Sequence, residues 1–158
     1  MGKTHISMAT FAAGCFWGVQ ETFDKVKGVK YSTTGYTGGT MEHPTYEEVS
    51  SDTSGHAQAV QLSYDPDVVT YETLLTTFWD LHDPTTTNRQ GPNIGSEYRS
   101  VIFYHSPLQK AAAEKSKAER EALGTYSQPI MTEIVAAGPF WKAEARHQKY
   151  NDKHSISG

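Results

Sequence analysis

The only cysteine of this 158-residue sequence, Cys15, is the side chain best suited to covalent chemistry. It lies in the segment AAGCFWG, where the pattern predicts that a strand ends and a helix begins. The unpaired N–H groups and the dipole at a helix start favour negative charge, so we expect the pKa of Cys15 to be lowered. Gly14 permits a tight turn that leaves the sulfur accessible. The alternative is a small buried core residue, since free cysteines are commonly buried.

Two large aromatic residues, Phe16 and Trp17, directly follow the cysteine. Neighbouring positions on a helix point about 100° apart, so both rings cannot face the same core. At least one of them can therefore line a surface pocket beside the sulfur. The alternative is that they open an amphipathic helix as core residues.

Other polar and aromatic residues are expected in loops or at strand ends, where sites are commonly built. Tyr46 follows a loop proline, His56 and Gln58 begin a predicted strand, and Tyr98 begins another. Each tyrosine, taken alone, is equally compatible with a half-buried aromatic ring and a solvated hydroxyl. The seven histidines have no helical H-x-x-x-H spacing and no cysteine partner, so no metal site is expected.

The surrounding pattern predicts the elements that must position these residues. Strands are predicted at residues 6–13, 29–36, 57–64, 98–105 and 130–136. Helices are predicted at residues 16–27, from a Thr70 cap to about Phe78, and from a Ser106 cap to Leu123. Long loops are predicted at residues 38–55 and 83–97, and the tail after residue 136 has little periodicity.

This order of elements is typical of an α+β fold. We expect a ferredoxin-like two-layer sandwich with split βαβ units, a mixed sheet covered by helices, and long loops around the active site. The length fits one domain over residues 1–158. No interface stripe is evident, so we expect a monomer.

Composition and charge exclude several classes of protein. The net charge is −4, with 14 basic and 18 acidic residues and no basic run, which argues against nucleic acid as a partner. No apolar run is long enough to span a membrane, and the N-terminal residues lack the apolar core of a signal peptide. A single cysteine cannot form an intramolecular disulfide, so we expect a reducing, cytoplasmic location.

The segment GCFWG is similar to the signature of the methionine sulfoxide reductase A family, the peptide-methionine (S)-S-oxide reductases. The resemblance continues in order through GYTGG, HPTYEEV, GHAQAV, YDP, FWDLHDPTTTNRQG, GSEYRS, GPFW and HQKY, over about residues 8–150. It implies that a thiolate attacks the sulfoxide sulfur of an oxidised methionine, free or in a protein. Methionine then leaves, and the cysteine becomes a sulfenic acid that a thiol reduces.

The resemblance also implies roles for individual residues. Cys15 resembles the nucleophile, and Phe16 and Trp17 resemble the walls that hold the methyl group of the substrate. Tyr46 and Tyr98 resemble the donors of hydrogen bonds to the sulfoxide oxygen. In the C-terminal segment, Trp141 and His147 resemble residues near the substrate pocket.

Two positions depart from the family pattern. Family members generally carry Glu, the expected proton donor, where this chain has Gln58, and Asp where it has Asn93 in the predicted substrate-binding loop. A glutamine can donate a hydrogen bond but cannot transfer a proton. One interpretation is a natural subfamily in which Tyr46, Tyr98 and water activate the oxygen; another is an introduced Glu→Gln change. We expect Gln58→Glu to change the rate of the chemical step.

A third departure is that no second cysteine is present to resolve the sulfenic acid. The resemblance then implies an external thiol reductant, which is thioredoxin, glutaredoxin with glutathione, or a small dithiol. No bound cofactor is implied.

Two other functions remain open on the residues alone. A cysteine hydrolase would use His56 or His147 to activate Cys15, but it does not explain the adjacent aromatic pair. A non-catalytic binder of oxidised methionine is compatible with Gln58.

Overall fold

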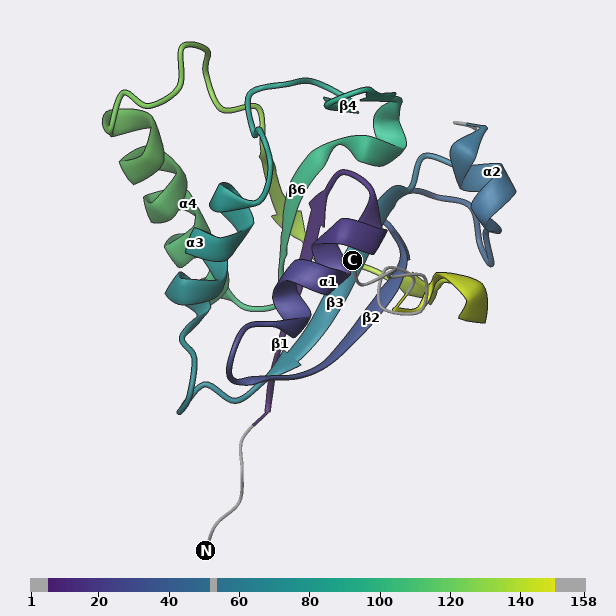
Figure 1. Cartoon of the computed structure of the whole chain (residues 1–158), viewed down its shortest axis with the longest axis horizontal. Helices are drawn as coiled ribbons and strands as arrows, with labels where there is room; N and C mark the ends of the chain where they lie inside the picture. Colours follow the sequence, from purple (N-terminus) through teal and green to yellow (C-terminus); the bar gives the residue numbers. More distant parts are fainter. Residues whose placement is uncertain (1–5, 52–53, 150–158) are drawn as a thin grey trace, which may run out of the picture.

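The structure is a computed structural model that describes residues 6–51 and 54–149, and its centre is one six-stranded mixed sheet (Figure 1). The strands are β1 (Ser7–Ala13), β2 (Val29–Thr37), β3 (Ala57–Tyr64), β6 (Ser100–Tyr104), β7 (Glu133–Ala136) and β8 (Phe140–Lys142). Their order in space is β7-β6-β1-β3-β2-β8, and only the β6–β7 pair is parallel. A mixed sheet combined with helices confirms the predicted α+β class.

Three of the four α-helices in the described residues begin directly after a capping Thr or Ser. They are α1 (Phe16–Asp24), α2 (Tyr46–Ser50), α3 (Tyr71–Asp80) and α4 (Pro107–Ala122), with the short 3-10 helices η1 (Ser96–Tyr98) and η2 (Ala145–His147). The Thr70 and Ser106 hydroxyls accept hydrogen bonds from backbone N–H groups three residues later, which confirms both predicted caps. Within the described residues, no helix combines the length and apolar character needed to cross a bilayer.

The sheet separates a large apolar cluster from a small one. On β1, Phe11 packs into the cluster that contains residues of α1, α3 and α4, whereas its neighbour Ala12 packs into the other. Figure 1 shows α1 crossing the strands β1 and β3, with α3 and α4 beside it. The small cluster consists of Ala12, Ala57, Ala59, Val101 and Phe103, with Ala137 and Phe140 packed against it. The alternation along β1 follows from the two-residue period of a strand.

The two outermost strands, β7 and β8, are joined by only three residues, 137–139. In a flat sheet, strands five places apart lie about 24 Å from each other. Four Cα–Cα steps, from Ala136 to Phe140, span at most about 15 Å. The sheet must therefore curl, and this curl brings the C-terminal segment around to β2.

Several predictions of irregular structure were wrong in detail. The predicted loops contain α2 and the hairpin β4 (Arg89–Gln90) and β5 (Asn93–Ile94), and the tail contains β8 and η2. These elements are too short to show a periodicity. Tyr98 belongs to η1 and does not begin a strand, because β1 ends at Ala13, which pairs with Ser100.

Candidate active site

Cys15 directly precedes α1 and follows Gly14, at the carboxyl end of β1. Gly14 has a φ of +99°, a conformation that residues with a side chain rarely adopt. A Cβ atom there would lie 2.8 Å from Cγ of Gln90, so the β4–β5 hairpin packs closely on the turn. The tight turn predicted at Gly14 is confirmed, and Cys15 is partly exposed.

The electrostatic environment of Cys15 differs from the expectation. Burial raises the pKa of the Cys15 thiol, and the carboxylate of Glu97 raises it further. The backbone N–H groups of Trp17 and Gly18, in the first turn of α1, lower the pKa but do not outweigh burial. The prediction of a lowered pKa was therefore wrong, since it considered the helix start and not the desolvation of the sulfur.

An aromatic cluster lies next to the cysteine and is formed by Phe16, Trp17, Tyr46 and His147. The rings of Tyr46 and His147 stack at 4.3 Å, and Trp17 lies 5.7 Å from His147 and 6.4 Å from Tyr46. Nε1 of Trp17 donates a hydrogen bond of 3.0 Å to Nδ1 of His147. Phe16 is fully buried and Trp17 is partly exposed. Both rings nevertheless contact Tyr46 and His147 and pack against the same apolar cluster, so the prediction that they cannot face one core was wrong.

Hydrogen bonds from β2 hold the C-terminal segment that supplies His147. The Thr34 hydroxyl donates to the carbonyl oxygen of His147 at 3.1 Å. The Gln148 side chain accepts from the Thr34 N–H at 2.9 Å and donates to its carbonyl oxygen at 3.0 Å. These contacts fix the segment against the sheet, and so they place His147 beside Tyr46.

Tyr46 and Tyr98, the two predicted donors, both have a raised pKa and therefore stay protonated at neutral pH. Burial raises the pKa of Tyr46 and of Tyr98, and the negative charge of Glu97 raises both further. The backbone of Tyr46 is held by Glu144, whose carboxylate accepts from the Tyr46 N–H at 2.9 Å and from the Tyr36 hydroxyl at 2.8 Å. Sequence reasoning missed Glu144, because nothing in its local pattern distinguishes it from a surface acid.

Gln58 and Glu97 form a buried pair beside the cysteine. Oε1 of Gln58 accepts a hydrogen bond of 3.1 Å from the N–H of Phe16, the residue after Cys15. Nε2 of Gln58 donates a hydrogen bond of 2.8 Å to Oε1 of Glu97. The exposed fractions of the two side chains are 1% and 3%. Sequence reasoning did not single out Glu97, although it directly precedes Tyr98 in the GSEYRS segment.

The remaining sequence candidates have other surroundings. Asn93 lies in β5 and pairs with Gln90 of β4. Trp141 lies in β8, and its ring contacts that of His43 at 4.4 Å. Both ring nitrogens of His56 bond to the 39–41 loop: Nδ1 accepts from the Gly39 N–H, and Nε2 contacts the Met41 carbonyl oxygen. His56 is therefore committed to holding that loop.

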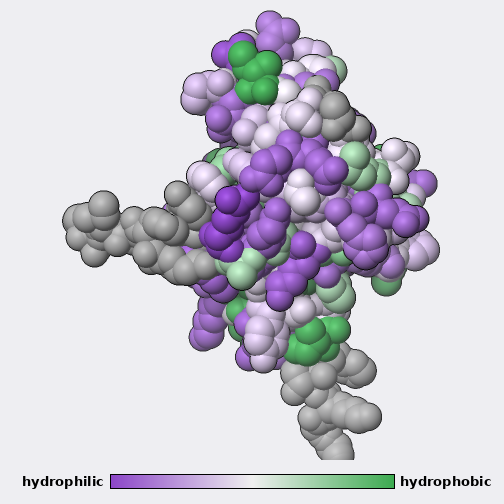
Figure 2. Space-filling model, turned by 90° about the vertical axis from the view of Figure 1, so that its right-hand side faces the viewer, coloured by the Kyte–Doolittle hydropathy of each residue, from purple (hydrophilic) through white to green (hydrophobic). Residues whose placement is uncertain are grey.

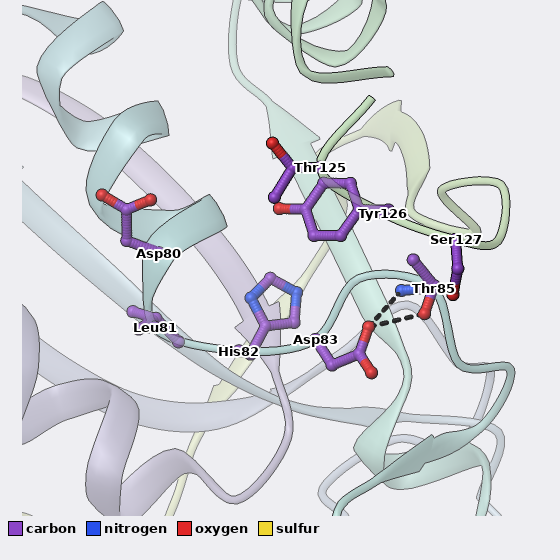
Figure 3. Close-up of a pocket in the computed structure, with 8 residues that line it drawn as sticks. All are labelled: Asp80, Leu81, His82, Asp83, Thr85, Thr125, Tyr126 and Ser127. Atoms are coloured by element: carbon purple, nitrogen blue, oxygen red, sulfur yellow. Dashed lines mark hydrogen bonds between the residues drawn. The ribbon is translucent and has the colours of Figure 1, made fainter. Parts of the chain in front are cut away.

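A separate pocket lies between the end of α3 and the loop after α4 (Figure 3). Its lining consists of Asp80, Leu81, His82, Asp83, Thr85, Thr125, Tyr126 and Ser127. The Asp83 carboxylate accepts hydrogen bonds from the N–H and the hydroxyl of Thr85, so it serves the local turn. None of the predicted site residues lines this pocket. In the part of the chain that the structure describes, no group of three or more potential ligands could hold a metal ion.

Comparison with known proteins gives consistent matches along the whole described chain. The profile of the peptide methionine sulfoxide reductase family matches residues 7–157. The peptide methionine sulfoxide reductase MsrA of Geobacter sulfurreducens is 56% identical over 154 residues, which cover 97% of this chain and 95% of the relative. The crystal structure of reduced Mxr1 from Saccharomyces cerevisiae has a TM-score of 0.87 at 31% identity, covering 99% of this chain and 90% of that one. Mxr1 in complex with Trx2 has a TM-score of 0.64 at 26% identity, with coverages of 94% and 87%.

The matched region begins at β1 and extends past η2, so it includes every element that carries a predicted site residue. The thiol at the start of α1 and its aromatic neighbours lie within this region. On the length of the family match and the identity to its members, the chain belongs to the peptide methionine sulfoxide reductase family.

Proposed function

We propose that Cys15 reduces the S-epimer of methionine sulfoxide, free or in peptides and proteins, to methionine. The observation that carries this proposal is the contact between the start of α1 and the ring cluster of Phe16, Trp17, Tyr46 and His147. An apolar, aromatic wall suits the methyl group of the substrate, and the adjacent thiol can reach its sulfur. Repair of oxidised methionine is the resulting function.

The net step transfers one oxygen atom and two electrons. The S–H bond of Cys15 and the S–O bond of the sulfoxide break, while an S–O and an O–H bond form in the sulfenic acid. The Cys15 sulfur is oxidised by two electrons, and the substrate sulfur is reduced by two. Tyr46 and Tyr98 donate hydrogen bonds to the departing oxygen, because their raised pKa values keep them protonated.

The sulfenic acid is then reduced by an external thiol, and we propose thioredoxin as the first choice. The complex of the structural neighbour Mxr1 with Trx2 supports this assignment. The single thiol of this sequence supports it too, since no intramolecular disulfide can form. Glutaredoxin with glutathione and a small dithiol are the alternatives, and no bound cofactor takes part.

A single-turnover experiment tests the reductase function. Stoichiometric protein is mixed with N-acetyl-methionine S-sulfoxide without reductant, and methionine and free thiol are measured. We expect one methionine formed and one thiol lost per chain, and neither in the Cys15→Ser variant. Absence of methionine would refute the proposal, and binding without methionine would favour the non-catalytic binder. Turnover with each of the three reductants then identifies the one that supports the fastest rate.

The hydrolase alternative has little support. Both nitrogens of His56 are engaged by the 39–41 loop, and Nδ1 of His147 accepts from the Trp17 indole. Neither histidine is therefore arranged as a base dedicated to Cys15.

We also propose the finer features of the molecule. The strand order β6-β1-β3-β2, with helices on one face, supports a ferredoxin-like two-layer description. One sheet that draws on both ends of the described chain supports a single domain over residues 1–158. The face drawn in Figure 2 is mostly hydrophilic with small separate apolar patches, which supports a monomer. The lone thiol supports a reducing, cytoplasmic location.

A further inference from the structure

Glu97 is the only buried carboxylic acid in the described part of the chain, and it lies at the cysteine. Its side chain is 3% exposed and accepts the 2.8 Å hydrogen bond from Gln58. It also bonds the Tyr98 side chain. Burying a carboxyl group costs free energy that a merely structural role would avoid by using an amide.

Gln58 orients this carboxyl group. The Phe16 N–H bonds to Oε1 of Gln58, so the amide NH2 group must face Glu97. The NH2 group donates to Oε1 of Glu97 and so fixes the orientation of the carboxyl group next to the Tyr98 side chain. A chain of two hydrogen bonds thus links Glu97 to the residue that follows the nucleophile.

The charge of Glu97 acts on all three reacting groups of the proposed mechanism. It raises the pKa of Cys15, of Tyr46 and of Tyr98. Glu97 is therefore close to both the thiol and the phenols that would surround the sulfoxide oxygen. A carboxylate can take up a proton and release it again, whereas the phenols hold theirs because their pKa values are raised, and the amide of Gln58 cannot release one.

We propose that Glu97 carries the proton from the Cys15 thiol to the sulfoxide oxygen, and that Gln58 is its positioning residue. The carboxylate takes the proton as Sγ attacks the substrate sulfur, and it returns that proton to the oxygen as the S–O bond of the substrate breaks. Glu97 ends in its starting state, so no further co-reactant is needed. This inference rests on the proposed reductase function, and it assigns the acid that Gln58 cannot provide.

The first test is the isosteric variant Glu97→Gln, with Glu119→Gln on the exposed face of α4 as the charge-matched control. We expect the single-turnover rate of methionine formation to fall about 10²–10⁴-fold in Glu97→Gln with unchanged substrate affinity. The pKa of Cys15, measured by alkylation against pH, should fall because a negative charge has been removed. Glu119→Gln should match the wild-type chain in both measurements.

The second test exchanges the two members of the pair. In the double variant Gln58→Glu with Glu97→Gln, one carboxyl and one amide remain, but on opposite sides of the hydrogen bond. We expect this variant to recover most of the rate that Glu97→Gln loses. It also controls for misfolding, since the composition of the buried pair is unchanged.

Two results would overturn the proposal. One is a Glu97→Gln rate within about threefold of wild type, far less than general acid–base catalysis contributes. The other is a double variant as slow as Glu97→Gln alone, which would assign the loss to disturbed packing. In either case the wild-type chain would still form methionine, whereas failure of the reductase function itself would abolish methionine in every variant.

Discussion

At the scale of the residue, the state of the Cys15 sulfur results from two opposing effects. Burial and the Glu97 carboxylate favour the neutral thiol, while two N–H groups of α1 favour the thiolate. The raised pKa means that burial outweighs the helix start. The raised pKa keeps most of the thiol protonated at neutral pH, so the attack proposed for Cys15 requires that this proton be removed.

Alkylation by iodoacetamide should report this raised pKa. Because only the thiolate reacts, we expect Cys15 at pH 7 to react more slowly than free cysteine, whose pKa is about 8.5. The rate should still rise with pH beyond that value. A titration midpoint below that of free cysteine would contradict the prediction.

The two tyrosines at the site should act as hydrogen-bond donors. Tyr46→Phe and Tyr98→Phe each remove one hydroxyl and keep the ring. We expect each to slow single-turnover methionine formation by about 10²-fold, the usual loss for one donor to a developing charge. Tyr31→Phe, at a side chain that is 74% exposed, is the control and should leave the rate unchanged. Unchanged rates in both site variants would remove the hydroxyls from the mechanism.

At the scale of the element, the turn between β1 and α1 sets the position of the sulfur. The two glycines that flank CFW there have different structural roles. Gly14 has a positive φ and touches Gln90, whereas a Cβ atom on Gly18 would meet no atom within 4 Å. Only at position 14 does the backbone conformation favour glycine.

Alanine substitutions separate these roles. We expect Gly14→Ala to lower the free energy of unfolding by about 1–3 kcal/mol, because of the positive φ and the contact with Gln90. Gly18→Ala should raise it by about 0.5–1 kcal/mol, since Gly18 lies within α1 and alanine has the higher helix propensity. Urea unfolding measures both changes. Equal effects of the two substitutions would contradict the assigned roles.

At the scale of the whole molecule, the partly buried His82 joins the end of α3 to the sheet. Nδ1 of His82 donates to the Phe78 carbonyl oxygen at 2.7 Å, and Nε2 accepts from the Ser100 hydroxyl at 2.8 Å. Ser100 in turn bonds to Thr132 at 2.7 Å. Burial lowers the pKa of His82 to about 4, which keeps the ring neutral in the folded protein.

This histidine should make stability depend on pH. Between about pH 6.5 and pH 4, His82 is protonated in the unfolded chain but remains neutral in the folded protein. Stability is therefore complete above pH 6.5 and falls as the pH is lowered, by at most about 3 kcal/mol. In His82→Asn, the free energy of unfolding should depend less steeply on pH between about pH 6.5 and pH 4, because this contribution is removed. A slope equal to that of the wild-type chain would contradict the prediction.

Elements with a clear period or cap could be predicted from the sequence. The Thr70 and Ser106 caps and the strand over residues 57–64 agree with the structure. The pairs β4–β5 and β2–β8 could not be predicted, because strands of two or three residues exist only where a partner accepts their hydrogen bonds. For the same reason, β6 begins at Ser100 because that residue pairs with Ala13, the last residue of β1. The residue types of β6 alone do not define this start.

The sequence by itself determined that its one thiol lies at a strand-to-helix turn beside two aromatic rings. Its ordered motifs also determined the family. Only the tertiary structure decided the state of that thiol and the partners around it. Gln58 meets Glu97 across 39 positions, and Trp17 meets His147 across 130. Burial and electrostatic interactions depend on residues that are close in space but far apart in the sequence, so a local sequence pattern cannot reveal them.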